Sequence, residues 1–528
     1  QAGLRILESA SHSPVDPVER PGIWRTRLSS SLVAPCLVHM AMSSVLSEAV
    51  DADDLFDLGN TFDDQGQYDQ AVIAYRRCIE LRSAAGAEPD VVADTWLNLG
   101  HALRSAGHAT EAEAAWVQAL LSNESEAFIQ RNAVLLSHGS VFQPNAGEEG
   151  RDNTRMDRLS DVLHGLGVFD PDLLQKFGCR QCATGPEVHR LRHGPAHKSG
   201  LLTDAQDAFV RIFCVGAGVQ LASAETALGH EATTTLRGHG LLIDILDGRY
   251  CIGAVQLFPF KGLLIATDWS SETLGPPGDP VMAIGTDSME LCFCLGDGNG
   301  APSFVGGAAV LDLCTGSGIA ALHASLCGAC RVVAVDLSPR ACMFASANAA
   351  LNKLDVTVHC GDLYTALPPR NDMFDLILAN PPFVAAPAHP ARRPTLFVDG
   401  GPDGLAVTRR VLSQATKHLL PGGACLIEGE FPNIGGSDGG MRPQWLCGLG
   451  DHASFTAIFA EAHVQLAEEY AADRAYPPLS ADDWSASLRE NGVCDMTSGL
   501  LIARCGLDVH DDRPWSSQRV TWEARDAD

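Results

Sequence analysis

The stretch Val310-Leu311-Asp312-Leu313-Cys314-Thr315-Gly316-Ser317-Gly318 decides the fold. It is an apolar run that ends in a glycine-rich turn, and three similar runs follow it. Val332–Val335 ends in Asp336, another run ends at Gly361-Asp362, and Phe374–Ala379 ends at Asn380. Short apolar runs that alternate with helical stretches predict a parallel sheet whose ligand site lies at the carboxyl ends of the strands.

The residues at these strand ends suit a nucleotide-like cofactor. Gly316 and Gly318 remove side chains where a ligand approaches the backbone at the start of a helix. Asp336 is placed to accept hydrogen bonds from both ribose hydroxyls, and Asp362 to accept one from an adenine amine. An oxidoreductase fingerprint fits less well, because position 321 is Ala where that fingerprint has its third glycine.

The fourth strand end carries a different kind of group. Asn380 is followed by Pro381, Pro382 and Phe383. The two prolines stiffen the backbone and leave the carbonyls of Asn380 and Pro381 free to accept hydrogen bonds, while Phe383 offers a flat apolar face. This element therefore predicts a site for a planar, hydrogen-bond-donating group.

Together these elements resemble a class I methyltransferase that depends on S-adenosylmethionine. The Asn-Pro-Pro-Phe element resembles the subset that methylates a planar nitrogen, which is adenine N6, guanine N2 or a glutamine amide. The segments Asp399–Leu405, Leu420–Gly423 and Glu428-Gly429 are similar to the release-factor glutamine methyltransferase group. That group usually has Tyr where this chain has Phe383, and its helical amino-terminal domain is not evident here. The resemblance covers about Val281 to Gly506.

The resemblance implies a Rossmann-like, seven-stranded α/β domain with S-adenosylmethionine as cofactor and no metal. It implies a cofactor site of seven residues: Asp312, Thr315, Gly316, Gly318, Asp336, Asp362 and Asn380. The implied catalytic residues are Asn380, Pro381, Pro382 and Phe383.

Composition limits the partners. The formal net charge of −28 over 528 residues lacks the basic footprint of a general nucleic-acid binder. Seventeen cysteines without a secretory signal indicate thiols in a reducing compartment. We expect no membrane span and a cytoplasmic location, with import into an organelle as the alternative if residues 1–45 are a transit segment.

The chain divides into six expected segments. They are a leader (1–50), helical repeats (51–138), a linker (139–156), an accessory helical and hairpin domain (157–300), the methyltransferase domain (301–507) and a polar tail (508–528). In the accessory domain, helices followed by a small hairpin suggest a winged-helix-like module. Its cluster Cys179, Cys182, His189 and His193 has one zinc-like half, but the gap before His189 is short, so free thiols and surface histidines are favoured over a zinc site.

The repeats are recognised from two matching sets of small and large residues. Leu55, Leu58, Gly59, Phe62, Gly66, Ala71 and Tyr75 recur 41 residues later as Trp96, Leu99, Gly100, Leu103, Gly107, Ala112 and Trp116. The pattern resembles the tetratricopeptide repeat, with an insertion near residues 83–90 and a capping helix over Ser125–Ser137. A concave peptide-binding surface for a protein partner and a helical spacer are equally compatible with it.

Three functions remain open from sequence. The favoured one is methylation of a protein glutamine amide or another non-nucleic acceptor, because of the acidic balance and the Gly401–Leu405 match. The second is methylation of adenine N6 or guanine N2 in RNA or DNA. The third is a non-catalytic repeat scaffold with a vestigial methyltransferase fold, against which the intact set of strand-end residues argues.

Overall fold

The computed structural model describes residues 51–137, 153–178, 201–269, 280–296, 305–369, 373–389, 395–434, 444–446, 453–475, 479–505 and 515–519. The leader, most of the linker and the Cys179–His193 cluster lie outside these residues.

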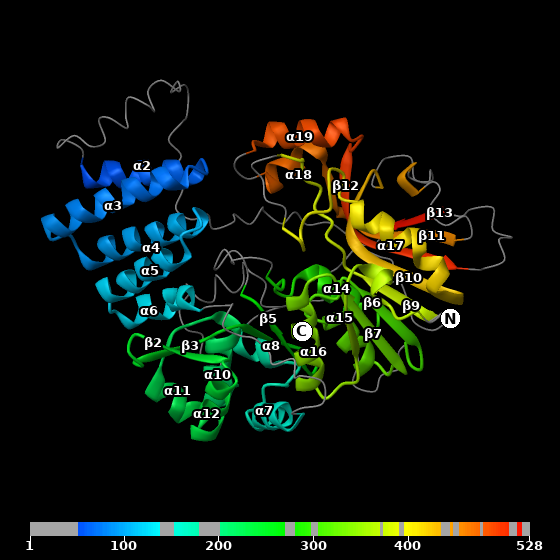
Figure 1. Ribbon diagram of the computed structural model, residues 1–528, viewed down its shortest axis with the longest axis horizontal. Coiled ribbons are helices and arrows are strands. Elements are labelled where there is room, and N and C mark those ends of the chain that lie inside the picture. The colour runs from blue at the N-terminus through cyan, green and yellow to red at the C-terminus, as the bar shows by residue number, and fades with distance from the viewer. Residues whose placement is uncertain are drawn as a thin grey trace, which may run out of the picture. The chain divides into compact units, whose positions relative to one another are not determined.

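Two helical hairpins and a capping helix form the repeats (Figure 1). The hairpins are α2 (Ala52–Asp64) with α3 (Tyr68–Ala85) and α4 (Pro89–Ser105) with α5 (Ala109–Ser122), followed by α6 (Glu126–Asn132) and the short η1 (Ala133–Leu136). A Cβ atom on Gly59 would lie 2.5 Å from Tyr75 Cε1, and one on Gly100 would lie 2.2 Å from Trp116 Nε1. The paired small and large positions therefore exist because each glycine makes room for an aromatic ring of its own hairpin.

The accessory region contains the expected helices and a small sheet. Its helices are α7 (Asn153–Gly165), α8 (Leu173–Phe177), α10 (Asp204–Phe209), the π-helical η2 (Val210–Val215), α11 (Leu221–Leu228) and α12 (His230–Gly238). Strands β1 (Val219–Gln220), β2 (Leu242–Ile245) and β3 (Tyr250–Gly253) pair antiparallel in the order β1-β3-β2. Helices that lead into a three-stranded antiparallel sheet have winged-helix-like topology, but this sheet is not the hairpin expected over residues 249–267.

One predicted strand of this region is corrected. The alternating pattern of Arg249–Phe258 and Gly262–Thr267 predicts two strands, but Arg249–Phe258 is divided between β3 and β4 (Gln256–Phe260). Strand β4 pairs with β5 (Leu263–Thr267) in a separate two-stranded hairpin. Helix α7 also begins at Asn153, inside the expected linker.

An eight-stranded sheet organises the rest of the chain, in the order β13-β11-β12-β10-β9-β6-β7-β8. The parallel strands are β6 (Ala309–Leu313), β7 (Arg331–Asp336), β8 (Thr357–Cys360), β9 (Phe374–Ala379) and β10 (Leu419–Pro432), and β12 (Asp495–Cys505) runs antiparallel to β10. The chain leaves β6 toward β7 and β8 and then returns to β9 on the other side of β6. This reversal is the switch point at which open α/β sheets bind their ligands.

Both faces of the sheet are buried, which explains the nearly continuous apolar runs. On one face Val310, Val332 and Leu376 join a core that includes α15 (Ile319–Leu326) and α16 (Pro339–Leu351). On the other face Leu311, Val333 and Ile377 pack with α17 (Ala406–His418). Residues one apart in each strand therefore enter different cores, as the two-residue period of a strand requires.

The sheet has eight strands, one more than the seven that were expected. Trp515–Arg519, placed in the polar tail, forms β13 and pairs in parallel with β11 (Ala453–Leu466). Strand β11 and the helices α18 (Ala467–Arg474) and α19 (Ala481–Glu490), which lie between β11 and β12, had no clear sequence pattern. Helix α14 (Thr286–Phe293) precedes the expected domain start at 301 but packs against α15 and β10 of the sheet domain.

Two asparagines on α16 attach the β4–β5 hairpin to the sheet domain. Asn348 accepts a hydrogen bond from Ala266 N (2.8 Å) and donates to Ala266 O (2.9 Å) and Ser317 O (2.8 Å). One helical turn later, Asn352 accepts from Leu264 N (2.9 Å) and donates to Leu264 O (2.9 Å). The side-chain amides thus satisfy the free edge of β5 as a neighbouring strand would, and Asn348 also supports the glycine-rich loop.

We expect Asn348→Ala to destabilise the protein strongly. Asn348 is fully buried, and its removal leaves Ala266 N, Ala266 O and Ser317 O without their partner. Unpaired buried polar groups cost about 1–3 kcal/mol each, so the free energy of unfolding should fall by ~3 kcal/mol or more. Chemical unfolding measures this, with Asn491→Ala as the control, because the Asn491 amide bonds only the exposed end of its own helix. A loss of stability as small as that of the control would show that the hydrogen bonds of Asn348 contribute little.

Candidate active site

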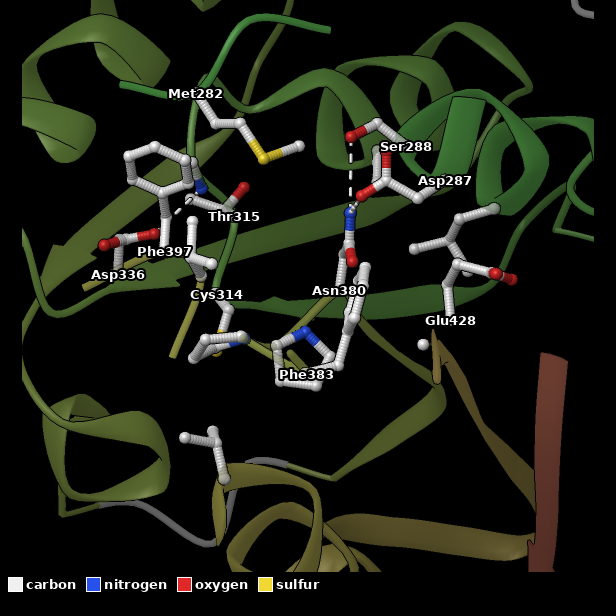
Figure 2. Close-up of a pocket in the computed structure, with 18 of the residues that line it drawn as sticks. Met282, Asp287, Ser288, Cys314, Thr315, Asp336, Asn380, Phe383, Phe397 and Glu428 are labelled. Atoms are coloured by element: carbon white, nitrogen blue, oxygen red, sulfur yellow. Dashed lines mark hydrogen bonds between the residues drawn. The ribbon is translucent and has the colours of Figure 1, made fainter. Parts of the chain in front are cut away.

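A cavity of about 700 Å³ lies at the carboxyl ends of β6, β7, β9 and β10 (Figure 2). Every site residue named from sequence except Gly318 lines it: Asp312, Thr315, Gly316, Asp336, Asp362, Asn380, Pro381, Pro382 and Phe383. The parallel strand order brings these residues together from positions up to 71 apart in the chain.

The glycine-rich loop is shaped from within. Asp312 is 1% exposed, and its Oδ2 accepts hydrogen bonds from Thr315 Oγ1 (2.5 Å) and Ala321 N (3.1 Å). Burial raises the pKa of Asp312 to about 7, against the effect of these two bonds. Gly318 caps α15 at a φ of 88°, and a Cβ there would lie 3.1 Å from Ala345 Cβ. Gly318 therefore allows α15 to approach α16, whereas a Cβ on Gly316 would meet nothing within 4 Å.

Asp336 is held in one orientation at the end of β7. Its Oδ2 accepts from Gly316 N (2.8 Å) and its Oδ1 accepts from Ser338 N (2.8 Å). Burial raises its pKa, and the backbone N–H groups of Ser338, Gly316 and Leu337 oppose that rise. Each oxygen retains a lone pair, so the fixed carboxylate can still accept hydrogen bonds from a vicinal diol.

Asp362 lies at the cavity with a cationic partner. Arg410 Nη2 of α17 is 2.6 Å from Asp362 Oδ2. Both side chains are about half exposed, which makes the ion pair weak. Leu363 follows with a φ of 47°, so the chain turns sharply beside the carboxylate.

Asn380 has one end of its amide anchored. Nδ2 donates to Asp287 Oδ2 (2.8 Å) and to Ser288 Oγ (3.3 Å), both on α14. Figure 2 shows the amide nitrogen pointing to these two residues. Because the nitrogen is used, Oδ1 is the end that remains for a ligand, and no residue in the described part of the chain donates to it.

The backbone that follows Asn380 is hydrogen-bonded to two other parts of the chain, and the first of these is the segment 398–405. In the segment 398–405, Val398 O accepts from Val384 N and Gly401 O accepts from Ala386 N, each at 2.9 Å. A Cβ on Gly404 would lie 2.5 Å from Phe383 O, which explains the glycine at that position.

Helices α18 and α19 hold the same loop from the other side. Tyr470 Oη accepts from Ala385 N (3.1 Å), and Trp484 Nε1 donates to Ala385 O (2.9 Å). Tyr470 also donates to Glu430 Oε2 at 2.6 Å, and Arg474 pairs with the other oxygen of the Glu430 carboxylate. The loop that carries Phe383 is therefore fixed by side chains about 85–100 residues away.

Several lining residues were not predicted. Besides Asp287 and Ser288 they include Met282, Glu290, Leu396, Phe397, His463, Gln465, Arg474 and Ser498. Among these residues, only those of α14 lie near a recognisable sequence signal. Gly285-Thr286-Asp287 has the glycine and the early acidic residue that are typical of the start of a helix. Phe397 and the residues of β11 carry no local pattern that distinguishes them from ordinary loop and strand residues.

Carboxyl groups dominate the side of the cavity next to Asn380. Glu428 is 3% exposed; burial raises its pKa well above the usual range, and Glu290 and Asp287 raise it further, while a bond from Gly429 N lowers it. Burial also raises the pKa of Glu290, and nearby His463 lowers it. Because these neighbouring carboxyl groups raise one another's pKa, a cationic ligand that allows them to ionise is favoured there, and a phosphate of a nucleic-acid strand is disfavoured.

Two parts of the chain match known protein families. Residues 310–395 match the family model described as a methyltransferase domain, and residues 55–84 match that of a tetratricopeptide repeat. Residues 310–395, which contain strands β6 to β9, are therefore similar to a methyltransferase domain, and the resemblances to a methyltransferase domain and to a tetratricopeptide repeat are confirmed for the matched residues.

Three of the similar proteins are described as glutamine methyltransferases. The ribosomal protein uL3 glutamine methyltransferase of Bradyrhizobium diazoefficiens is 44% identical over 128 residues, which cover 22% of this chain and 40% of that protein. The corresponding protein of Burkholderia pseudomallei is 36% identical over 161 residues, covering 28% and 52%. The release factor glutamine methyltransferase of Bordetella pertussis is 43% identical over 128 residues, covering 22% and 46%. This chain thus spans about half the length of these relatives.

The residues present fit S-adenosylmethionine. The oriented Asp336 carboxylate suits the ribose diol, the side-chain-free Gly316 leaves space beside it, and the carboxyl groups around Asn380 suit a cationic sulfonium. No group of three or more His, Cys, Asp or Glu in metal-binding arrangement occurs within the described ranges. Across those same ranges, every helix is too short or too polar to span a bilayer.

We expect Glu428→Gln to stabilise the protein in a pH-dependent way. A folded-state pKa above the unfolded value means that the folded protein retains a proton that the unfolded chain releases. Stability is therefore lost as the pH rises from about 4.5 toward the folded pKa, by about 1.4 kcal/mol per pH unit. Gln keeps the shape without this loss, so thermal unfolding should match the parent near pH 4.5 and occur at a higher temperature near pH 8.

The exposed Glu490 provides the control, because Glu490→Gln should follow the parent at every pH. A Glu428→Gln variant that is less stable than the parent at pH 8 would mean that the folded protein stabilises the ionised carboxylate.

Proposed function

We propose that this chain transfers a methyl group from S-adenosylmethionine to the side-chain amide nitrogen of a protein glutamine. The observation that carries the proposal is the anchored amide of Asn380, whose nitrogen is used on Asp287 and Ser288 and whose oxygen remains for a donor. The substrates named for the three relatives, which are ribosomal protein uL3 and release factors, support a protein acceptor.

The residues around the acceptor have distinct roles in this proposal. A glutamine amide has two N–H groups, which would donate to Asn380 Oδ1 and to the Pro381 carbonyl. These bonds orient the nitrogen and increase its electron density, and the Phe383 ring would pack on the flat amide, a contact of ~1 kcal/mol. Alignment matters most here, because bound S-adenosylmethionine already supplies an activated methyl group on a sulfonium.

The residues at the other strand ends would bind the cofactor. Asp336 would accept hydrogen bonds from the ribose hydroxyls, Gly316 would leave space for the backbone approach, and Asp362 would face the adenine amine. Thr315 and Asp312 maintain the shape of the loop through their own bond. The amide nitrogen gives its lone pair to the methyl carbon and then releases one proton, so the products are an N-methylamide, a neutral thioether and a proton.

A nucleic-acid base is the second candidate, because the accessory region has winged-helix-like topology. Its helix α12, which leads into the hairpin, is engaged by α7: Arg158 lies 3.5 Å from Glu231, and Arg155 donates to Gly238 O. Together with the carboxyl groups at the cavity, this contact favours the protein acceptor. The repeats, with 15 Asp and Glu against 5 Lys and Arg in residues 51–138, are proposed to contact a basic segment of the protein partner.

Radiolabelled methyl transfer to a cell lysate tests the acceptor. Label that is removed from the macromolecular fraction by protease and unaffected by nuclease is expected, and hydrolysis should release N-methylglutamine. Label that is sensitive to nuclease would contradict the proposal and support the second candidate.

Two variants should separate binding from transfer. Asp336→Ala should weaken S-adenosylmethionine binding by about 1.5–3 kcal/mol, because charged hydrogen bonds are lost. Asn380→Ala should lower turnover by ~100-fold, the scale of a lost orienting contact, and change cofactor affinity by less than ~0.5 kcal/mol. Calorimetry and single-turnover kinetics measure the two effects, and wild-type turnover in Asn380→Ala would exclude the role given to this residue.

A further inference from the structure

The amide of Asn380 has two orientations of nearly equal shape. In one, Oδ1 faces the cavity and can accept a hydrogen bond; in the other, the NH₂ group faces it and cannot. The nitrogen that receives the methyl group carries N–H groups, so only the first orientation of the Asn380 amide can accept a hydrogen bond from it. Some feature of the chain has to select that orientation.

Asp287 selects the orientation in which Asn380 Oδ1 faces the cavity. Its carboxylate only accepts hydrogen bonds, and its Oδ2 lies 2.8 Å from Asn380 Nδ2. In the reversed orientation Asn380 Oδ1 would face that carboxylate oxygen, with two acceptors in contact and no hydrogen between them. Ser288 Oγ, at 3.3 Å, can donate as well as accept, so it supports either orientation.

The position of Asp287 is itself fixed by its helix. Asp287 lies in the first turn of α14, which packs against α15 and β10 through the buried residues Met289, Leu291 and Cys292. Gly285 caps this helix, and a Cβ there would lie 2.3 Å from Asp287 Oδ1. The second carboxylate oxygen thus occupies space that only glycine leaves open.

We propose that Asp287 is a positioning residue that fixes the Asn380 amide with its oxygen toward the methyl acceptor. The inference rests on the proposed function for its catalytic consequence, but the contact itself can be tested without any substrate. It also assigns a role to α14, a segment 93 residues before Asn380 that no motif in the sequence identified.

Side-chain amide NMR of protein labelled with ¹⁵N-asparagine tests the contact directly. The Asn380 NH₂ signal is identified by its loss in Asn380→Ala. It should move in Asp287→Ala and in Gly285→Ala, where the added methyl group displaces the Asp287 carboxylate. An unmoved signal in both variants would overturn the proposal, whatever the outcome of the methylation assay.

Kinetics test the consequence. Asp287→Ala should lower kcat by ~10-fold or more, with cofactor affinity unchanged, because the orientation at the reacting atom is lost. Asp287→Asn, whose amide can pair with either orientation of Asn380, should cost less, on the order of 2- to 5-fold. Ser288→Ala should cost less than Asp287→Ala, since the Ser288 bond is longer and not selective.

A double-mutant cycle distinguishes positioning from direct substrate contact, because Asp287 also lines the cavity. If Asp287 acts through Asn380, Asp287→Ala should have no further effect on kcat in the Asn380→Ala background. An additive loss would overturn the proposal and make Asp287 a substrate-contacting residue.

An exchange of the two groups provides a rescue test. Asn380→Asp alone places two carboxylates in contact, whereas Asn380→Asp combined with Asp287→Asn restores one donor and one acceptor with the original total charge. The combined variant should be ~10-fold faster than Asn380→Asp alone, since the amide introduced by Asp287→Asn can donate to the carboxylate at position 380 and hold it in place, whereas the carboxylate of Asp287 repels it. Equal rates for the two variants would overturn the proposal; matched thermal stability of all variants confirms that folding is intact.

Discussion

The segment Asn380–Ala386 forms no regular strand or helix, so its polar groups have to be satisfied by other parts of the chain. Helix α14 bonds the Asn380 amide, and the segment 398–405 and helices α18 and α19 bond the backbone from Val384 to Ala386. A loop held from three directions keeps its shape without a ligand. The proposed chemistry needs this, because methyl transfer from an activated donor depends mainly on alignment.

The strand-end residues were predictable because two local signals determine them. Nearly continuous apolar runs identify β6, β7 and β9 as strands, and parallel strands place their carboxyl ends on one edge of the sheet. Asp312, Asp336 and Asn380 therefore converge even though no residue pattern links them directly. The cofactor side of the cavity follows from sequence for this reason.

The residues that line the cavity around Asn380 were harder to predict from the sequence. Asp287, Phe397 and Arg474 reach the cavity through tertiary packing, and the surroundings of each are ordinary for a helix, loop or strand end. The same applies to α18 and α19, which are recognisable only by their contacts with Ala385. The eighth strand was missed for a related reason: Trp515–Arg519 is short and polar, and its pairing with β11 decides its conformation.

The accessory region and the residues that line the cavity are connected by one series of contacts. The hairpin strand β5 is bonded by Asn348, which also bonds Ser317 in the glycine-rich loop. Asp268, the first residue after β5, is buried and accepts hydrogen bonds from Arg340 Nε and Val281 N, each at 2.8 Å.

Val281 begins the short segment that leads through Gly285 to Asp287 and so to Asn380. The glycine-rich loop and the segment that leads to Asp287 are therefore both supported from α16, through Asn348 and Arg340 respectively. In this arrangement residues before 301 line the cavity, and hydrogen bonds to Asn348 and Asp268 connect the β4–β5 hairpin to both sides of it.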